Sequence, residues 1–583
     1  MLWATLIALP LIYVLNLSIR FLHNLQLARK TNLPYIIFPL FEANLLYIGL
    51  FETKWFPYVL SNWAPEWIAD YVNDGIFKAR WSVKDRMAKK YGGVYLYVTP
   101  GGISCNVGDA EVVNQICKAR HSFIKPIEHL GRYIAPVFND RNYALVWTES
   151  LEQATQMLDY WVEEHSTASS KHIFTIPDTR EDILKLTLNI ICSAGFGVKL
   201  PFKPTPQALS PAADMKVDGL FKDAVEPPRG YTFTFRGVME YMNRSLLSVF
   251  LANGVLPKWV PRWSVPFFKV DFAAHDDLGR YLQVLVNSAE GDKDESHDLL
   301  QSIVRSRRDE RNLSEADANR QAMQNKRPGL SDEEVLGNVY IFSIAGHETT
   351  ATTLRFALVL LALHQDIQDE LYDEISRVLS DGLTNASEWG YTATFPNLIM
   401  PLCVMLETLR LFPPAPSIPK KTAAGPVSLN YNGQTHHLPP DVRVNLNASA
   451  LHYSEKYWGQ DTNTFDPRRW DKRNASSFLA RNDGTEGLSA PGLESSHIHK
   501  PARGTYISFS DGMRACIGRR FAQVEFVAVL VAIFSRYRVR LGKIPQDESE
   551  RDVKRRVEKA LGESLSFITL SMREDVPLVF EER

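Results

Sequence analysis

The chain has 583 residues, of which 45% are hydrophobic and 23% are charged, and its formal net charge is −2. These proportions are those of an ordinary folded protein, so they argue against a disordered chain, a collagen and a multi-span membrane protein. A net charge this close to zero also provides no field that would hold a nucleic-acid backbone, so no nucleic-acid partner is expected.

The N-terminal segment predicts a membrane-anchor helix over residues 1–22. Residues 1–19 contain no charged side chain, and basic residues begin at Arg20 and continue to Lys30. A run of this length is at the lower limit for crossing a hydrocarbon core, and the basic flank after it predicts that the rest of the chain faces the cytosol. A cleaved signal peptide is the alternative, but it requires basic residues before the apolar run and a small-residue cleavage site after it.

Two further regions are predicted after the anchor. Residues 23–40 contain the sequence LPYIIFP and are typical of a stiff, basic, proline-containing linker, whereas residues 41–583 are expected to form one domain. The cysteines lack paired spacing, which favours reduced thiols over a disulfide framework. They are Cys105, Cys117, Cys192, Cys403 and Cys516.

The predicted elements of the large domain are mostly helices. Residues 94–98 and 103–107 alternate as strands do and flank a Pro-Gly-Gly turn, so they predict a small hairpin. Helical periodicity covers residues 150–164, 180–192, 276–289 and 331–363. Polar runs at residues 290–295, 305–328 and 471–503 are predicted to be surface loops. The sequence therefore predicts a mainly α fold with small β-sheets.

The helix predicted at 331–363 carries an unusual polar motif. It begins with the capping box Ser331-Asp-Glu-Glu334, and its uncharged stretch at 339–345 is expected to be buried on every face. The sequence AGHETT follows from Ala345, in which Gly346 weakens the helix by roughly 1 kcal/mol relative to alanine. Thr349 can donate to the carbonyl of Ala345 and open the helix locally, although threonines on buried helices usually satisfy themselves in this way without any catalytic role.

A second motif combines charges that are distant in sequence. Glu407 and Arg410 stand one helical turn apart in ETLRLFPPAP, and FDPRRW follows downstream with Arg469. Taken alone, such a helical pair is usually a surface ion pair.

The most specific signal is the loop FSDGMRACIG, which precedes an apolar helix predicted over residues 519–537. Its spacing matches F-x-x-G-x-R-x-C-x-G at five positions, which ordinary residue frequencies produce by chance in on the order of one chain in ten thousand. A thiolate that approaches a metal from a tight turn needs glycines around it, and helix N–H groups stabilise its charge. A buried structural cysteine beside a helix cap is the alternative for Cys516.

These motifs resemble those of the cytochrome P450 family, most of all fungal microsomal members that act in specialised metabolism. The resemblance implies the cytochrome P450 fold with an N-terminal membrane anchor, and a haem b whose iron takes its axial thiolate from Cys516. It further implies proton transfer by Glu348 and Thr349 and a buried structural triad of Glu407, Arg410 and Arg469. Other residues that would contact the cofactor are Arg514 at a haem propionate, Phe509, Gly512, Gly518, Ala345 and Gly346.

The resemblance also implies an activity and partners. The expected reaction inserts one atom of O2 into a small lipophilic substrate, with electrons from NADPH through NADPH–cytochrome P450 reductase. The expected location is the endoplasmic reticulum membrane, with the catalytic domain in the cytosol. Arg519 and Arg520 are candidate contacts for the reductase, and the segment VLPKWVPRW (255–263) is either a second contact with membrane lipid or core packing.

One family motif is missing from the sequence. The segment around residues 125–136 is too short for the W-x-x-x-R helix, whose arginine binds a second haem propionate in the family. His129, Arg132, Lys420 and Lys421 are candidate substitutes, and a skipped exon or an erroneous gene model is the preferred explanation. Two alternative functions therefore stay open: a haem-thiolate isomerase or dehydratase that works without reductase, and a catalytically silent, haem-poor protein.

Overall fold

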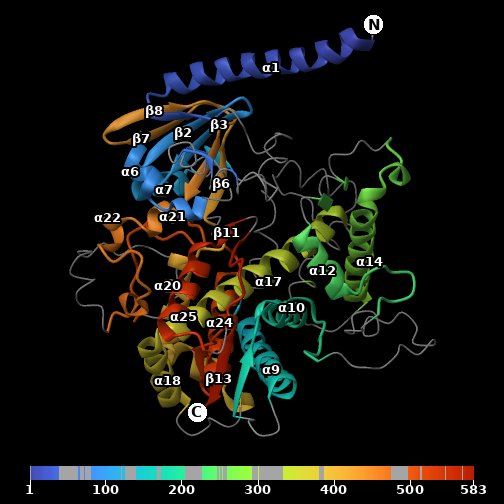
Figure 1. The fold of residues 1–583 in the computed structure, drawn as a ribbon, viewed down its shortest axis with the longest axis vertical. Coiled ribbons are helices and arrows are strands. Elements are labelled where there is room, and N and C mark those ends of the chain that lie inside the picture. The colour runs from blue at the N-terminus through green and yellow to red at the C-terminus, as the bar shows by residue number, and fades with distance from the viewer. Residues whose placement is uncertain are drawn as a thin grey trace, which may run out of the picture. The chain divides into compact units, whose positions relative to one another are not determined.

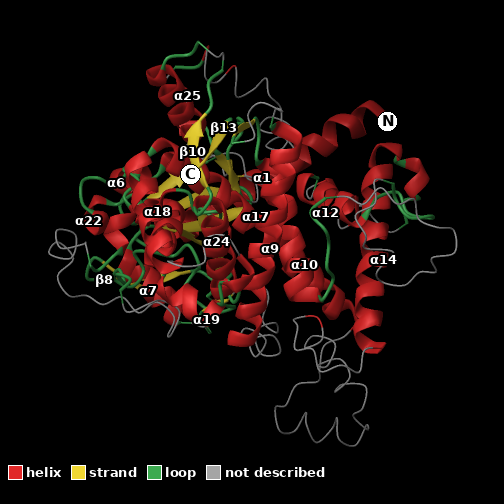
Figure 2. Cartoon of the chain, turned by 90° about the horizontal axis from the view of Figure 1, so that it is seen from below, coloured by secondary structure: helices red, strands yellow, loops and turns green. Residues whose placement is uncertain are grey.

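The computed structural model describes most of the chain, and helices make up the larger part of the described residues (Figure 2). The described residues are 2–38, 59, 63–65, 71–72, 80–119, 121–124, 139–166, 172–203, 226–245, 248–249, 252–253, 259–291, 300, 332–379, 386–473, 497–512, 515–544, 547–566 and 569–583. The chain forms two compact units. The first unit comprises Met1–Glu128, Leu402–Cys516 and Ile544–Asp575, and the second comprises His129–Pro401, Ile517–Lys543 and Val576–Arg583.

The first unit contains a six-stranded sheet with the order β1-β2-β3-β9-β6-β4. Its strands are β1 (Tyr35–Ile37), β2 (Val94–Thr99), β3 (Gly102–Val107), β4 (Phe123–Ile124), β6 (Ser417–Thr422) and β9 (Arg443–Asn447). The predicted hairpin is confirmed, because β2 and β3 pair antiparallel from Val94 opposite Val107 to Thr99 opposite Gly102. Apolar residues of these strands and of α7 (Ala110–Lys118) form the core of this sheet.

Smaller elements complete the first unit. The helix α20 (Ile399–Leu411) belongs to it except for its first turn, and its side chains are buried. The other helices are α5 (Arg80–Val83), α6 (Arg86–Tyr91), α21 (Ala448–His452), α22 (Glu455–Trp458), η8 (Pro467–Trp470) and α25 (Glu550–Gly562). Two hairpins join β7 (Val427–Tyr431) to β8 (Gln434–Leu438), and β11 (Leu565–Ser566) to β12 (Leu570–Ser571).

The N-terminal helix α1 (Leu2–Lys30) extends beyond the predicted anchor and lies along β2 and β3 (Figure 1). Among the described residues, no single helix is both long enough and apolar enough to pass as a membrane span, and one bent pair (Tyr391–Asn397 with Ile399–Leu411) passes only by length and composition. The predicted linker differs from the structure at both ends. At its start, residues up to Lys30 are helical. Near its end, β1 pairs parallel with β2 at the edge of the sheet, and the prolines of the predicted linker flank this edge strand in the sequence.

The second unit is built on long helices. The helices α9 (Asp140–His165), α10 (Arg180–Phe196) and α17 (Asp332–Leu363) lie side by side, and α24 (Arg519–Phe534) packs on α9 (Figure 1). A three-stranded sheet has the order β10-β13-β5. The remaining elements are α12 (Phe235–Arg244), α14 (Lys269–Gly291), α18 (Gln365–Leu379), α19 (Tyr391–Thr394), η4 (Arg262–Ser264), η5 (Pro266–Phe268), η6 (Ala386–Glu388), η7 (Phe395–Asn397), β5 (Ile173–Ile176), β10 (Tyr537–Leu541) and β13 (Leu578–Glu582).

The predicted helices all form, but several of their ends differ. The helix α9 begins at Asp140 rather than at residue 150, because Asn139 caps it by accepting from the N–H groups of Arg141 and Asn142. The helix predicted to reach residue 537 ends at Phe534, since the chain there turns into β10.

The predicted surface loops lie largely outside the described residues. The ends of the loop at 471–503 are an exception, because Asp471 and Ile498 form a β-bridge and are 2% and 0% exposed. The prediction that this whole run lies on the surface is therefore wrong at its ends, since polar composition did not reveal their pairing.

Candidate functional site

The cysteine loop is a closed turn that presents its thiol outward. Cys516 is exposed, whereas the other four cysteines are buried. The N–H of Cys516 donates to the carbonyl of Phe509 at 2.7 Å, and the N–H of Ser510 donates to the carbonyl of Ile507 at 2.7 Å. These bonds bring the described ends of the segment together, and the thiol of Cys516 is exposed beside them.

The two glycines of the loop do not have the same role. Gly512 has a φ of 73°, and a Cβ on it would lie 2.7 Å from the carbonyl oxygen of Cys117, so both its conformation and the space around it require glycine. Gly518 precedes α24 with a φ of −81°, which any residue can adopt. The predicted need for unusual dihedrals therefore holds at Gly512 and not at Gly518. Phe509 is half-buried, and Arg514 lies outside the described residues.

The charged motifs meet at Glu407, which is completely buried in the first unit. Both of its carboxylate oxygens accept from the guanidinium group of Arg410 at 2.8 Å. Arg469 donates to Oε1 at 3.0 Å, and Trp470 donates its indole N–H to Oε2 at 2.9 Å. Burial raises the pKa of Glu407, but the two arginines outweigh burial and hold that pKa below its ordinary value.

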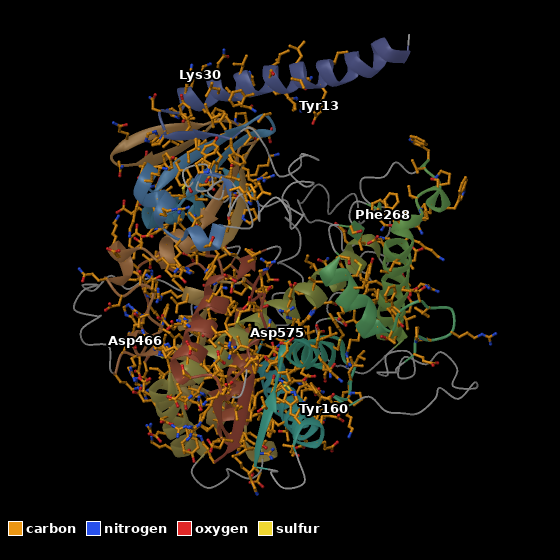
Figure 3. All side chains as sticks on the ribbon, in the orientation of Figure 1. Tyr13, Lys30, Tyr160, Phe268, Asp466 and Asp575 are labelled. Carbon is orange, nitrogen blue, oxygen red and sulfur yellow. The ribbon has the colours of Figure 1, made fainter. Side chains whose placement is uncertain are left out.

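The remaining donors of this network also have partners. Arg410 donates through Nη1 to the backbone carbonyls of His452 at 2.9 Å and Thr462 at 2.8 Å. The backbone N–H of Asp466, labelled in Figure 3, donates to Glu407 at 3.1 Å. The structure thus brings Glu407, Arg410 and Arg469 into direct contact, and a surface role for the pair is excluded. Sequence reasoning missed His452, for which no motif gave a signal, and Trp470, which adjoins Arg469.

The polar motif on α17 lies in the second unit and keeps the helix intact. The hydroxyl of Thr349 donates to the carbonyl of Ala345 at 2.9 Å, as the sequence predicts. The helix is nevertheless continuous from Asp332 to Leu363, so the expected local opening is not seen. A Cβ on Gly346 would lie 3.3 Å from Ile191 of α10, which indicates that this glycine permits close helix packing.

Residues on one side of α17 are exposed, which corrects the expectation of burial on every face. Val339 is 0% exposed, whereas Ile341 is 42% exposed and Ala345 is also exposed. These two residues and Thr349 are spaced four apart, so they lie on one side of the helix. The result is an apolar strip with a hydroxyl group at its end. Glu348 is half-buried beside it.

Two buried titratable groups near this motif were not predicted. The Nδ1 atom of His347 lies 2.5 Å from the carbonyl of Ser343, and burial lowers its pKa to about 4, so the ring is neutral. Glu525 on α24 is fully buried, and burial holds its pKa well above the ordinary value, an effect that nearby Thr350 partly opposes. Neither carboxyl oxygen of Glu525 makes a regular hydrogen bond within the described part of the chain.

Two of the four candidate substitutes for the missing arginine are described by the structure, and both are lysines of β6. His129 and Arg132 lie outside the described residues. Lys421 forms an ion pair with Asp441 at 2.8 Å, and Lys420 is 5% exposed on β6. The described lysines are thus engaged within the sheet or buried on it.

The predicted reductase contacts are also corrected in part. Arg519 is 7% exposed, so it does not present its charge at the surface. Burial lowers its pKa to about 10, which still leaves it a cation at neutral pH. Arg520 lies over the ring of Phe395 at 4.4 Å. The expectation failed at Arg519 because the helix direction, which the motif does not reveal, turns that side chain inward.

Comparisons with known proteins agree with these features. The family model described as Cytochrome P450 matches residues 128–560. A cytochrome P450 monooxygenase of Arthrobotrys oligospora is 30% identical, over 95% of this chain and 94% of the relative. A second, from Penicillium roqueforti, is 28% identical over 91% of this chain and 90% of the relative. The crystal structure of the haem domain of cytochrome P450DA matches with a TM-score of 0.57 at 19% identity, covering 86% of this chain and 91% of that one, which shows a shared fold.

Proposed function

Because the chain belongs to the cytochrome P450 family and is a cytochrome P450 monooxygenase, we propose that Cys516 supplies the axial thiolate of a haem b. The proposed reaction inserts one oxygen atom of O2 into a small lipophilic substrate. The observation that carries this proposal is the exposed thiol on a closed, glycine-dependent turn, because the other four cysteines are buried. A bound haem supplies the oxygen chemistry, and thiolate ligation favours O–O cleavage.

The residues of α17 support proton transfer and substrate binding. Thr349 has a hydroxyl that can exchange its bond to Ala345 for a bond to a water molecule or to oxygen, and Glu348 is a carboxylate at the adjacent position. The strip of Ile341 and Ala345 offers apolar contact to a lipophilic substrate. These two functions fit a monooxygenase, in which protons must reach oxygen near an apolar substrate.

The electron donor and the location are proposed from the resemblance. Electrons come from NADPH through NADPH–cytochrome P450 reductase, and the chain is held at the endoplasmic reticulum membrane by α1. Tyr13, labelled in Figure 3, is 54% exposed on α1, and Ile12 and Leu15 are 63% and 61% exposed. Trp259 and Trp263 are more than four-fifths exposed, at 82% and 83%, beside Arg262, which supports a second contact with membrane lipid.

The test of the proposed function uses the reduced carbon monoxide complex of the full chain. A long-wavelength Soret band indicates thiolate ligation, and we expect Cys516→Ala to lose it while Cys192→Ala, at a buried cysteine, retains it. A Cys516→Ala variant with an unchanged spectrum and undiminished activity would exclude the proposal. Absence of haem from the wild-type chain supports the silent protein instead. Turnover that needs no NADPH and reductase identifies the isomerase or dehydratase.

A further inference from the structure

We propose that His452 is a positioning residue that holds the chain leading into the cysteine loop and so sets the ligation of Cys516. This inference rests on the proposed role of Cys516. It concerns a histidine that is 0% exposed, lies at the end of α21 and takes part in no motif of the sequence.

The ring of His452 bridges two parts of the first unit. Its Nδ1 lies 3.1 Å from the backbone carbonyl of Arg410, and its Nε2 lies 3.0 Å from the backbone N–H of Ile507. A carbonyl can only accept, and a backbone N–H can only donate. Nδ1 therefore carries the proton and Nε2 presents its lone pair, so the two contacts fix one neutral tautomer.

The ring is held rigidly by its surroundings. The guanidinium of Arg410 donates to the carbonyl of His452 at 2.9 Å, so these two residues are joined by two hydrogen bonds in opposite senses. The ring of Tyr506 stacks on His452 at 5.1 Å with an angle of 21°, and also packs edge-on against Trp470 at 4.9 Å. His452 is thereby tied to the network around Glu407, and it transmits the position of that network to Ile507.

The bond to Ile507 lies where the cysteine loop begins. The carbonyl of Ile507 accepts from Ser510 at 2.7 Å, and the hydroxyl of Ser508 donates to the carbonyl of Leu409 at 3.0 Å. The carbonyl of Phe509, next along the chain, accepts from Cys516. Two hydrogen bonds therefore connect His452 to the backbone of Cys516: Ile507 donates to His452, and Cys516 donates to Phe509. The further bonds of Ser508 and Ser510 restrict the backbone between them.

Two substitutions at His452 separate its two contacts. A glutamine carbonyl can stand at the position of Nε2 and accept from Ile507, whereas an asparagine amide can stand at the position of Nδ1 and donate to Arg410. His436→Gln is the matched control, because His436 is 6% exposed in the same unit and its Nδ1 lies 2.9 Å from the carbonyl of Thr31, away from the loop.

The measurement is the fraction of bound haem that gives the long-wavelength band in the reduced carbon monoxide complex, with thermal stability recorded beside it. We expect His452→Gln and His436→Gln to keep this fraction. His452→Asn should lower the ratio of long- to short-wavelength forms at least about fivefold, since an unpaired buried N–H shifts an equilibrium by about five- to 150-fold. Equal fractions in the two His452 variants, or an equal loss in His436→Gln, would overturn the positioning role.

Hydrogen exchange of the wild-type chain decides the matter if neither His452 variant folds. The amide of Ile507 should then be as protected as the amides of α20, and exchange at the rate of exposed loop amides would refute the contact. The two proposals fail differently. A wild-type chain that binds haem without the long-wavelength band contradicts the proposed thiolate, whereas a normal wild-type band with indistinguishable His452 variants contradicts only the role of His452.

Discussion

Glu407 shows how one buried charge depends on all of its partners. Replacing it by glutamine removes the negative charge that compensates Arg410 and Arg469, and leaves two buried cations without an anion. We expect Glu407→Gln to lower the free energy of unfolding by about 3–5 kcal/mol, measured by denaturant titration. The exposed ion pair of Arg540 and Glu581 provides the control, because Glu581→Gln should change stability by less than about 1 kcal/mol. Similar values for the two variants would show that the buried network is not needed for stability.

Glu525 is also buried, but unlike Glu407 it is more stable in its neutral form than as a carboxylate. A carboxyl group whose pKa is raised by folding binds a proton in the folded state at pH values where the unfolded chain has released it. Stability therefore falls as the pH rises above the ordinary pKa of glutamate. We expect Glu525→Gln to stabilise the protein at about pH 7.5 and to stabilise it less at about pH 5, as measured by the thermal midpoint. A benefit that is the same at both pH values would contradict a neutral Glu525 in the folded protein.

At the scale of the element, the cysteine loop depends on space as well as on backbone conformation. Gly512 and Gly433 have φ values of 73° and 74°, but a Cβ meets the carbonyl of Cys117 only at Gly512 and meets nothing within 4 Å at Gly433. Both alanine variants should lose about 1–2 kcal/mol from left-handed strain. Only Gly512→Ala should also lose bound haem, measured as Soret absorbance per protein, because the backbone of the loop or of α7 must move. Equal haem retention in both variants would show that the contact with α7 is dispensable.

The sequence predicted those elements whose stabilising contacts lie between residues close together in the chain. The hairpin of β2 and β3, the long helix α17 and the turn at Gly512 follow from alternation, periodicity and spacing, and the structure contains all three. The strand β1 was missed because two prolines flank it and its partner lies about sixty residues away in sequence, with Tyr35 opposite Leu96. His452 was missed for a similar reason, since its partners Arg410 and Ile507 are distant in sequence and a lone histidine carries no pattern.

At the scale of the whole molecule, buried neutral histidines predict sensitivity to acid. Burial lowers the pKa of His347 and His499 to about 4 and that of His452 to about 3, where Arg410 adds to the effect. The unfolded chain binds these protons near the ordinary histidine pKa of about 6.5. The contribution of the histidines is therefore complete above about pH 6.5 and is lost as the pH falls towards about 4.

This loss should be visible as a slope in the stability of the chain against pH. Between about pH 6 and pH 5, each such histidine lowers the free energy of unfolding by up to about 1.4 kcal/mol per pH unit, and Glu525 acts in the opposite direction. His499 is the residue to change, because it lies outside the cysteine loop and its pKa is lowered by burial and then by Lys472. We expect His499→Gln to reduce this slope by up to about 1.4 kcal/mol per pH unit, the value for one proton, in denaturant titrations over this range. A slope unchanged by His499→Gln would mean that this ring does not stay neutral in the folded protein, and the acid sensitivity would then have to arise from other groups, such as His347 and His452.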